Sequence, residues 1–243
     1  MTRVRTVVLL LTTVTVMGVA CGVGPAAAEW NFDLYGGAAK LNLSDFGVRG
    51  SDERGASVNI PALHVDTDWG FTVGVRGGYW LDPLPFLGFD LDVFYVQAPV
   101  PSQITKAATT VAGFVGEFLD RRITVSPDGV AVIPHTNLPL FGFAPEIRLR
   151  WPLLVDQTFP HGRLQPYITA GPSWAFSLKN DHVVLELGGK LGIGLAFQIA
   201  PAVALFTEYR YMFYPGFEFT DKNLTYKTDI NSHSAIVGLS LRF

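Results

Sequence analysis

The sequence has a single cysteine, Cys21, in 243 residues. It lies in an amino-terminal segment that starts with two arginines, continues as an apolar run over residues 7–20 and ends in the small residues of 25–28. This order of charge, apolar run and small residues is typical of a cleaved secretory signal peptide over residues 1–28. An uncleaved membrane anchor is the alternative, but the run is shorter than the ~20 residues that a span needs. We therefore predict an exported chain that begins at Glu29 and has no disulfide bond.

Charged residues are also scarce, at 16% of the chain, and the net charge is −3 at pH 7. A chain with so weakly acidic a balance offers no basic surface for nucleic acid, so no nucleic-acid partner is expected. After residue 28, no apolar run is long enough for a transmembrane helix. Hydrophobic residues nevertheless make up 49% of the chain, aromatic residues 13%, and there are 25 glycines. This composition leaves a secreted all-β domain or an outer-membrane β-barrel.

Eight segments alternate between apolar side chains and polar or small ones, as a β-strand does when its two faces have different surroundings. They cover residues 30–39, 69–81, 87–95, 140–151, 164–178, 185–198, 203–213 and 234–243. In the last of them every second residue back from Phe243 is apolar, and Ile236 is the exception on the other face. The segments match or slightly exceed the ~9–11 residues that a tilted strand needs to cross a membrane. Strands of soluble proteins are usually about five or six residues long, so the lengths favour a membrane barrel.

The connections between these segments differ in length between the two ends of the predicted barrel. Long connections follow three of the four odd-numbered segments, at residues 40–68, 96–138 and 214–232. Tight turns follow two of the three even-numbered segments, at residues 82–86 and 199–202. The short connection 179–183 and the longer turn 152–163 depart from the pattern. Long outside loops and short periplasmic turns predict an all-β, eight-stranded antiparallel up-and-down transmembrane β-barrel over residues 29–243, with long extracellular loops.

Charged residues within the segments fall mainly on the face opposite the apolar one. Six acids and six bases share this face: Asp33, Arg76, Asp90, Asp92, Glu146, Arg148, Arg150, Glu186, Lys190, Glu208, Arg210 and Arg242. Unpaired charges in a soluble core would each cost on the order of several kcal/mol. Inside a barrel they can pair across the lumen, and eight strands leave an interior only wide enough for side chains. We predict a lumen plugged by a structural charge network; a catalytic or proton-conducting role is the alternative.

The connection over residues 96–138 is the longest and predicts structure of its own. Ser102 is a suitable helix cap, and apolar residues follow it at three- and four-residue spacing up to Leu119, which predicts a short helix. Further along, Pro127-Asp128-Gly129 predicts the turn of a hairpin. This loop is expected to form a lid over the barrel mouth or a surface for an extracellular partner.

The sequence contains no arrangement typical of an enzyme or a metal site. Its five histidines, His64, His135, His161, His182 and His233, form no H-E-x-x-H pair for zinc. His233 and Ser234 are adjacent, and adjacent strand residues point to opposite faces, so they are poorly placed as a base and its nucleophile. Acids in the last connection, Glu218, Asp221 and Asp229, are interpreted as solvated charges. We predict no catalytic residue, no cofactor and no metal ion.

Three short motifs add a family resemblance to the eight segments. The fifth segment contains Pro166-Tyr167-Ile168-Thr169-Ala170-Gly171, the seventh Glu208-Tyr209-Arg210-Tyr211, and the chain ends in Leu241-Arg242-Phe243. Together they resemble the outer membrane β-barrel superfamily of OmpA-like and opacity-type proteins, as a barrel-only member. The resemblance implies a monomer in the cell outer membrane, among its lipid and lipopolysaccharide. It also implies insertion by the barrel assembly machinery, with Phe243 as the assembly signal.

Members of that superfamily do not share one activity, so any specific function is expected in the loops. The leading hypothesis is a structural or surface-interaction protein that serves envelope integrity or adhesion. A narrow channel or a binding barrel for a small apolar molecule is the alternative, and a lipid A-modifying enzyme is the third hypothesis. A secreted lipocalin-like barrel is the alternative at the level of the fold.

Overall fold

A computed structural model of the chain describes residues 29–51, 57–106, 114–118, 121–125, 130–179, 182–221 and 224–243. The signal peptide predicted over residues 1–28 lies outside the described residues. All thirteen regular elements within these ranges are β-strands. Within these ranges, no helix is long and apolar enough to cross a membrane.

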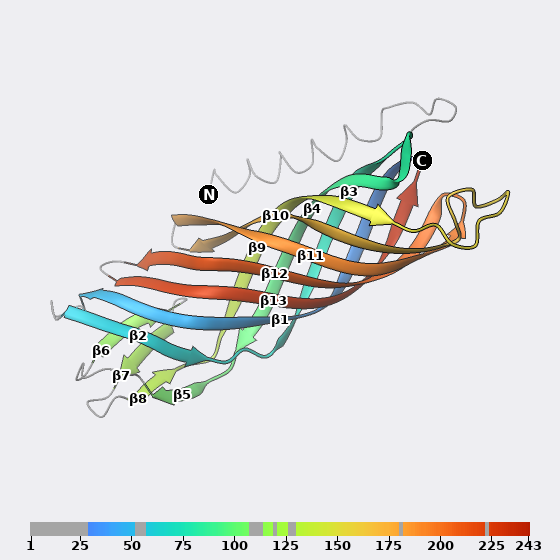
Figure 1. The fold of residues 1–243 in the computed structure, drawn as a ribbon. Coiled ribbons are helices and arrows are strands. Elements are labelled where there is room, and N and C mark those ends of the chain that lie inside the picture. Colours follow the sequence, from blue (N-terminus) through green and yellow to red (C-terminus); the bar gives the residue numbers. More distant parts are fainter. Residues whose placement is uncertain are drawn as a thin grey trace, which may run out of the picture.

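Eight of the strands form a closed antiparallel barrel in which each strand pairs with the next barrel strand along the chain (Figure 1). They are β1 (Glu29–Ser51), β3 (Trp69–Leu81), β4 (Leu84–Val100), β9 (Thr136–Arg150), β10 (Leu164–Lys179), β11 (His182–Ala200), β12 (Val203–Asp221) and β13 (Leu224–Arg242). The last strand pairs with the first, from Asn31↔Arg242 to Gly50↔Leu224. The predicted eight-stranded up-and-down barrel is therefore confirmed.

The two ends of the barrel differ. At one end, called here the turn end, lie the connections 82–83, 151–163 and 201–202 and the two ends of the described barrel. There the backbone N–H of Trp30 donates to the Phe243 carbonyl at 2.9 Å, and the N–H of Phe243 donates to the Trp30 carbonyl at 3.1 Å. The opposite end, called the loop end, carries the two longest connections, those between β1 and β3 and between β4 and β9, which contain the remaining short strands.

The alternation along each strand sends apolar side chains outward near the turn end. On β9, Phe143 and Ile147 are exposed on the exterior, whereas Glu146 and Arg148 between and beside them are buried inside. The same pattern exposes large apolar side chains around the barrel, among them Trp30, Leu34, Phe89, Leu191, Leu205 and Leu239. A water-soluble domain would bury such residues, so the exterior forms an apolar belt of the kind that faces lipid.

Several strands extend further toward the loop end than the sequence predicted. Strand β1 continues to Ser51, β12 continues to Asp221 and β13 begins at Leu224, and β12 and β13 stay paired up to Asp221↔Leu224. The predicted outside connections over 40–68 and 214–232 are therefore shorter than expected, because paired strand covers part of each range. Two changes interrupt the alternation on which the prediction relied. The inward side chains of β1 become apolar from Leu41, and the register shifts between Ser44 and Gly47 and between Tyr214 and Phe217. A bulge adds a residue to one strand, so a strict two-residue period is lost where the strand itself continues.

The long connection over residues 96–138 contains a separate four-stranded sheet in the order β5-β8-β7-β6, which lies with β2 (Ser57–Val65) at the loop end (Figure 1). Its strands are β5 (Gln103–Lys106), β6 (Phe114–Phe118), β7 (Arg121–Val125) and β8 (Val130–Ile133). The arms of the predicted hairpin are confirmed by the pairs Thr124↔Val132 and Val125↔Ala131; its Pro127-Asp128-Gly129 turn lies outside the described residues.

The helix predicted from Ser102 to Leu119 is wrong where the structure describes this segment. Strands β5 and β6 occupy its two ends, and residues 107–113 lie outside the described ranges. Pairing of β5 with β8 and of β6 with β7 supplies backbone hydrogen bonds that compete with a helix. Gly116 also lowers the helix propensity of this segment, so tertiary pairing decides its conformation.

Candidate functional site, a charged lumen

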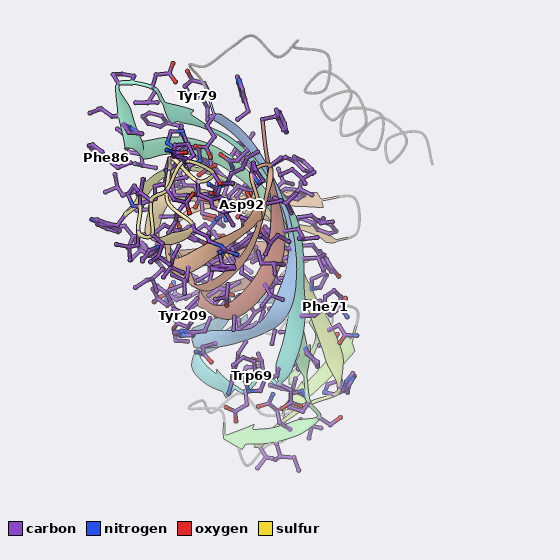
Figure 2. All side chains as sticks on the ribbon, turned by 90° about the vertical axis from the view of Figure 1, so that its right-hand side faces the viewer. Trp69, Phe71, Tyr79, Phe86, Asp92 and Tyr209 are labelled. Atoms are coloured by element: carbon purple, nitrogen blue, oxygen red, sulfur yellow. The ribbon has the colours of Figure 1, made fainter. Side chains whose placement is uncertain are left out.

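Charged side chains fill the interior of the barrel near the turn end. Figure 2 shows Asp92 inside the ring of strands, whereas Trp69, Phe71 and Tyr209 project from its outside. Eleven of the twelve residues expected in the lumen are buried: Asp33, Arg76, Asp90, Asp92, Glu146, Arg148, Arg150, Lys190, Glu208, Arg210 and Arg242. They come from every barrel strand except β10, which contributes the buried neutral side chains of Gln165, Tyr167 and Thr169.

Arg76 is the central cation of this network. Its Nε lies 2.9 Å from Asp33 Oδ2, and its Nη1 lies 2.8 Å from Glu208 Oε2 and 3.3 Å from Glu146 Oε1. The Arg76 side chain is 0% exposed. Because a guanidinium has five N–H donors in a rigid plane, one side chain can hold carboxylates from three directions. Arg76 of β3 thereby connects β1, β9 and β12 across the lumen.

Lys190 and Arg210 form a second centre around Asp92. Lys190 pairs with Asp92, and its Nζ lies 2.9 Å from Glu146 Oε2. Arg210 lies 3.1 Å from Asp92 Oδ2 and 3.0 Å from Glu208 Oε1. The Tyr35 hydroxyl donates to Asp92 at 2.7 Å and accepts from Arg210 at 2.8 Å. Glu146 and Glu208 are shared with Arg76, so the two centres form one continuous network.

Two further groups extend the network toward the turn end. Arg148 lies 3.0 Å from Asp33 and 2.8 Å from Asp90. Beyond it, Glu29 accepts from Arg150 at 2.6 Å and from Arg242 at 3.0 Å. The Arg150 guanidinium is also 3.9 Å from the centroid of the Trp80 ring and donates from Nε to the Pro85 carbonyl at 2.7 Å.

Sequence reasoning missed Glu29, because this residue was considered only as the first one after the signal peptide. Its place two positions before Asn31 and four before Asp33 on the same strand face was the available signal. Glu186 differs from the prediction in the other direction: it is only partly buried and belongs to none of the ion pairs among the described residues. With Glu29 in the network and Glu186 outside it, six acids pair with six bases.

The interior near the loop end is apolar, which the sequence analysis did not foresee. Its buried side chains include Leu41, Leu43, Val96, Val100, Leu138, Leu140, Phe217 and Ile230 of the barrel, with Val65 of β2 and Ile133 of β8. The exterior at this level is polar instead, with Asn42, Glu218 and Lys227 exposed. The described strands therefore enclose a charged layer and an apolar layer, one above the other.

Two possible sites can be compared with the described residues, a metal site and the pair His233 and Ser234. No group of three or more His, Cys, Asp and Glu that could hold a metal ion occurs in the described part of the chain. Ser234 is buried inside the barrel, whereas the His233 ring contacts the exterior residue Tyr211. The two side chains therefore point to opposite faces and cannot act as nucleophile and base.

No model of a known protein family matches the chain, and no curated protein matches it. Among solved structures, Neisserial surface protein A (NspA) is 16% identical with a TM-score of 0.44, and the match covers 91% of this chain and 100% of that one. The outer membrane protein OprG from Pseudomonas aeruginosa is 12% identical with a TM-score of 0.44, over 88% and 95% of the two chains. The outer membrane protease OmpT from Escherichia coli is 10% identical with a TM-score of 0.37, over 93% and 99%.

At these identities the likeness concerns the fold alone. The chain's own strand order, its closed β1–β13 seam and its apolar exterior define that fold, an eight-stranded β-barrel of the outer-membrane type.

Proposed function

We propose that the protein is an integral outer-membrane β-barrel with a structural or surface-interaction role, in which a filled barrel holds a rigid platform outside the cell. The observation that carries this proposal is the filling of the lumen by two layers, ion-paired near the turn end and apolar near the loop end. Such a barrel suits support and display better than transport.

The apolar belt supports insertion into a membrane. Outward-facing aromatic side chains occur at both edges of the belt. Trp30 and Trp151 are exposed and Tyr79 half-buried near the turn end, and Trp69 and Tyr209 are exposed and Tyr95 half-buried toward the loop end. Tryptophan and tyrosine at both edges are typical of membrane-spanning barrels, because their amphipathic rings suit the headgroup level. We place the turn end in the periplasm and the loop end outside the cell.

The charged layer argues against ion conduction. Arg76, Lys190 and Arg210 are each paired with two or more carboxylates, and their side chains are at most 1% exposed. An ion that crossed this layer would have to separate carboxylates from cations that are buried together, and charges separated in a buried layer lose the pairing that offsets their desolvation. The layer therefore closes the lumen.

The apolar layer and the short strands above it support the platform. Gln103 at the start of β5 accepts from the Asp66 N–H at 2.9 Å and donates to the Asp66 carbonyl at 3.0 Å, which ties the small sheet to the segment after β2. The Thr67 hydroxyl in turn donates to the Leu41 carbonyl of β1. These bonds hold the small sheet against the barrel, where it can present a fixed surface to a partner.

The apolar loop-end interior favours one second candidate, a barrel that binds a small apolar molecule. Entry would require movement of packed side chains such as Leu41 and Ile230, which are 0% and 1% exposed. Binding of a small apolar molecule in the apolar layer would not in itself allow that molecule to pass through the charged layer.

Two experiments test the proposed function. Deletion of residues 102–133 should abolish cell adhesion conferred by the protein, or its protection against detergent, while heat-modifiable gel mobility shows that the barrel still folds. In planar bilayers, the wild type and the Glu208→Leu and Arg210→Leu variants should show no single-channel current, although both variants should unfold at lower temperature. A large current through the wild type, or recovery of the protein as a soluble periplasmic species, would contradict the proposal.

A further inference from the structure

Four residues form one row across the outer face of the barrel. Tyr211 of β12 is directly opposite His233 of β13, His233 is opposite Lys40 of β1, and Lys40 is opposite Trp69 of β3. Directly opposite residues of antiparallel strands have Cβ atoms about 4.5–5.5 Å apart. The row therefore places Lys40 beside His233, with an aromatic residue on each flank.

The neighbours of Lys40 and His233 show that both residues face outward. Ala39 and Leu41, on either side of Lys40, are buried inside the barrel, and so are Ser232 and Ser234 beside His233. Strand residues alternate between faces, so the side chains between these buried neighbours lie on the exterior. Figure 2 shows Trp69 and Tyr209, which belong to the same face, projecting from the outside of the barrel.

A hydrogen bond and a ring contact orient the His233 side chain. The Tyr209 hydroxyl lies 2.7 Å from His233 Nδ1, and the Tyr211 ring lies 5.0 Å from the imidazole, centroid to centroid. When Tyr209 donates to Nδ1, the Nε2–H remains to donate to another group. The Tyr211 hydroxyl donates to Asn231 Oδ1 at 2.9 Å, which leaves the Asn231 amide N–H groups available in the same way.

The row lies at the edge of the apolar belt. On the outer face of β13, the turn-end side of the row is apolar, with Ala235, Val237, Leu239 and Leu241. The loop-end side is polar, with Asn231, Asp229 and Lys227. Trp69 is 63% exposed, as expected for an aromatic side chain at headgroup level. If the proposed function is right, this level contains the phosphate groups of the leaflet at the loop end.

The charge of the row suits an anion. Lys40 has no ion-pair partner among the residues that the structure describes, so its ammonium group is available to a ligand. The nearest acid on the same face of β13, beyond Asn231, is Asp229, whose carboxylate accepts from the Gly216 N–H at 2.6 Å. An anion at the row would meet three donors: the Lys40 ammonium group, the His233 Nε2–H and the Asn231 amide. The Asp229 carboxylate is already bonded to the Gly216 backbone N–H.

We infer that Lys40, His233 and Asn231 form a binding site for the phosphate group of a membrane lipid, flanked by Trp69 and Tyr211. The ammonium group supplies the charge, while Nε2–H of His233 and the amide of Asn231 supply directed hydrogen bonds. The aromatic side chains cover the lipid below the phosphate. This inference rests on the proposed placement in a membrane and adds to it a lipid class and a position on the barrel.

The test uses folded protein in the uncharged detergent dodecyl maltoside, with its histidines labelled with ¹⁵N for NMR. Dihexanoyl phosphatidic acid should shift the His233 imidazole resonances saturably, whereas dioctanoylglycerol, which has no phosphate, should not. Inorganic phosphate should bind at least about tenfold more weakly than the lipid, because it lacks the apolar contacts. Equal binding of inorganic phosphate and of the lipid would overturn the lipid assignment, and the absence of a saturable shift would overturn the site.

Substitutions separate this site from general attraction to a cationic surface. Lys40→Gln should weaken phosphatidic acid binding about tenfold, as expected for the loss of a charge-assisted contact. Lys227→Gln is the matched control, because it removes an exposed lysine from the same face of β13 above the row. It should leave binding unchanged, and an equal loss would contradict the site. The heat-modifiable gel mobility of each variant reports whether the barrel is folded. A folded variant that does not bind the lipid therefore counts against the phosphate site alone, whereas a barrel that does not fold counts against the membrane placement.

Discussion

The two halves of the barrel carry opposite polarity patterns on the same strands. On β13, Leu239 faces outward and Ser240 inward near the turn end, whereas Asn231 faces outward and Ile230 inward near the loop end. On β1 the inward positions change from Asp33 to Leu41. Alternation reports only that a strand has two different surroundings; which face is apolar depends on whether lipid or water lies outside.

The largest expected effect comes from removing the central cation of the charged half. Arg76→Leu leaves Asp33, Glu146 and Glu208 without a shared partner in a buried layer and should lower the free energy of unfolding by about 3–5 kcal/mol. Urea titration of the protein refolded into vesicles measures this. Arg49→Leu removes an exposed arginine from the loop-end exterior of β1 and is the control. A similar loss in both variants would mean that the buried position of Arg76 has no special importance.

A cavity in the apolar half should cost nearly as much. Leu41 is 0% exposed, so Leu41→Ala should lower the free energy of unfolding by about 2–5 kcal/mol through lost burial and an unfilled cavity. Asn42→Ala changes the neighbouring outward side chain and should have little effect. If the two variants unfold at the same urea concentration, the loop-end interior is not a packed core.

The exterior offers a direct test of the boundary between the halves. Val237→Arg places a cation in the apolar belt and should cost up to about 2–4 kcal/mol, depending on its depth in the bilayer. Asn231→Arg makes a cation on the same face of the same strand, beyond the row of Lys40 and His233, and should be tolerated. Folding yield into vesicles compares them, and equal yields would remove the evidence for a membrane boundary between residues 231 and 237.

Glu186 should give the smallest effect. It lies on the inward face of β11 but outside the ion pairs among the described residues, so Glu186→Gln should change the free energy of unfolding by less than about 0.5 kcal/mol. The same substitution at Glu208, which pairs with Arg76 and Arg210, should cost several times more. Thermal unfolding of both variants measures the difference, and equal losses would place Glu186 in the network.

The sequence was sufficient for the part of the barrel that has one uniform exterior. From Trp69 to Leu81 the alternation gave the bounds of β3, because lipid-facing and lumen-facing positions have clearly different residues there. It failed beyond Ala39 on β1 and Phe213 on β12, because the inward side chains of β1 become apolar from Leu41 and the register shifts after Ser44 and after Tyr214. No local sequence pattern indicates both the shift in register and the change in polarity of the two faces.

From the sequence, the charged lumen could be predicted only as a set of inward-facing residues, without the ion pairs between them. Alternation identified which charges face inward, but the partners of Arg76 are 43 to 132 positions away in the chain. Those distances depend on the shear of the closed barrel, which sets how far each strand is displaced relative to the next. The helix expected before Leu119 failed for another reason, because pairing of β5 with β8 and of β6 with the adjacent β7 outweighed a local apolar stripe.

The seam between β1 and β13 has a consequence for assembly. It joins the first described strand to the last, so the contact order of the closing pair approaches the full length of the barrel. Because closing a long loop costs more entropy than closing a short one, hairpins such as β12–β13 should form early and the seam last. Until then the edge of β13 that ends near Phe243 stays unpaired and open to an assembly factor. Pulsed hydrogen exchange during refolding should show the Trp30 and Phe243 amides among the last to be protected.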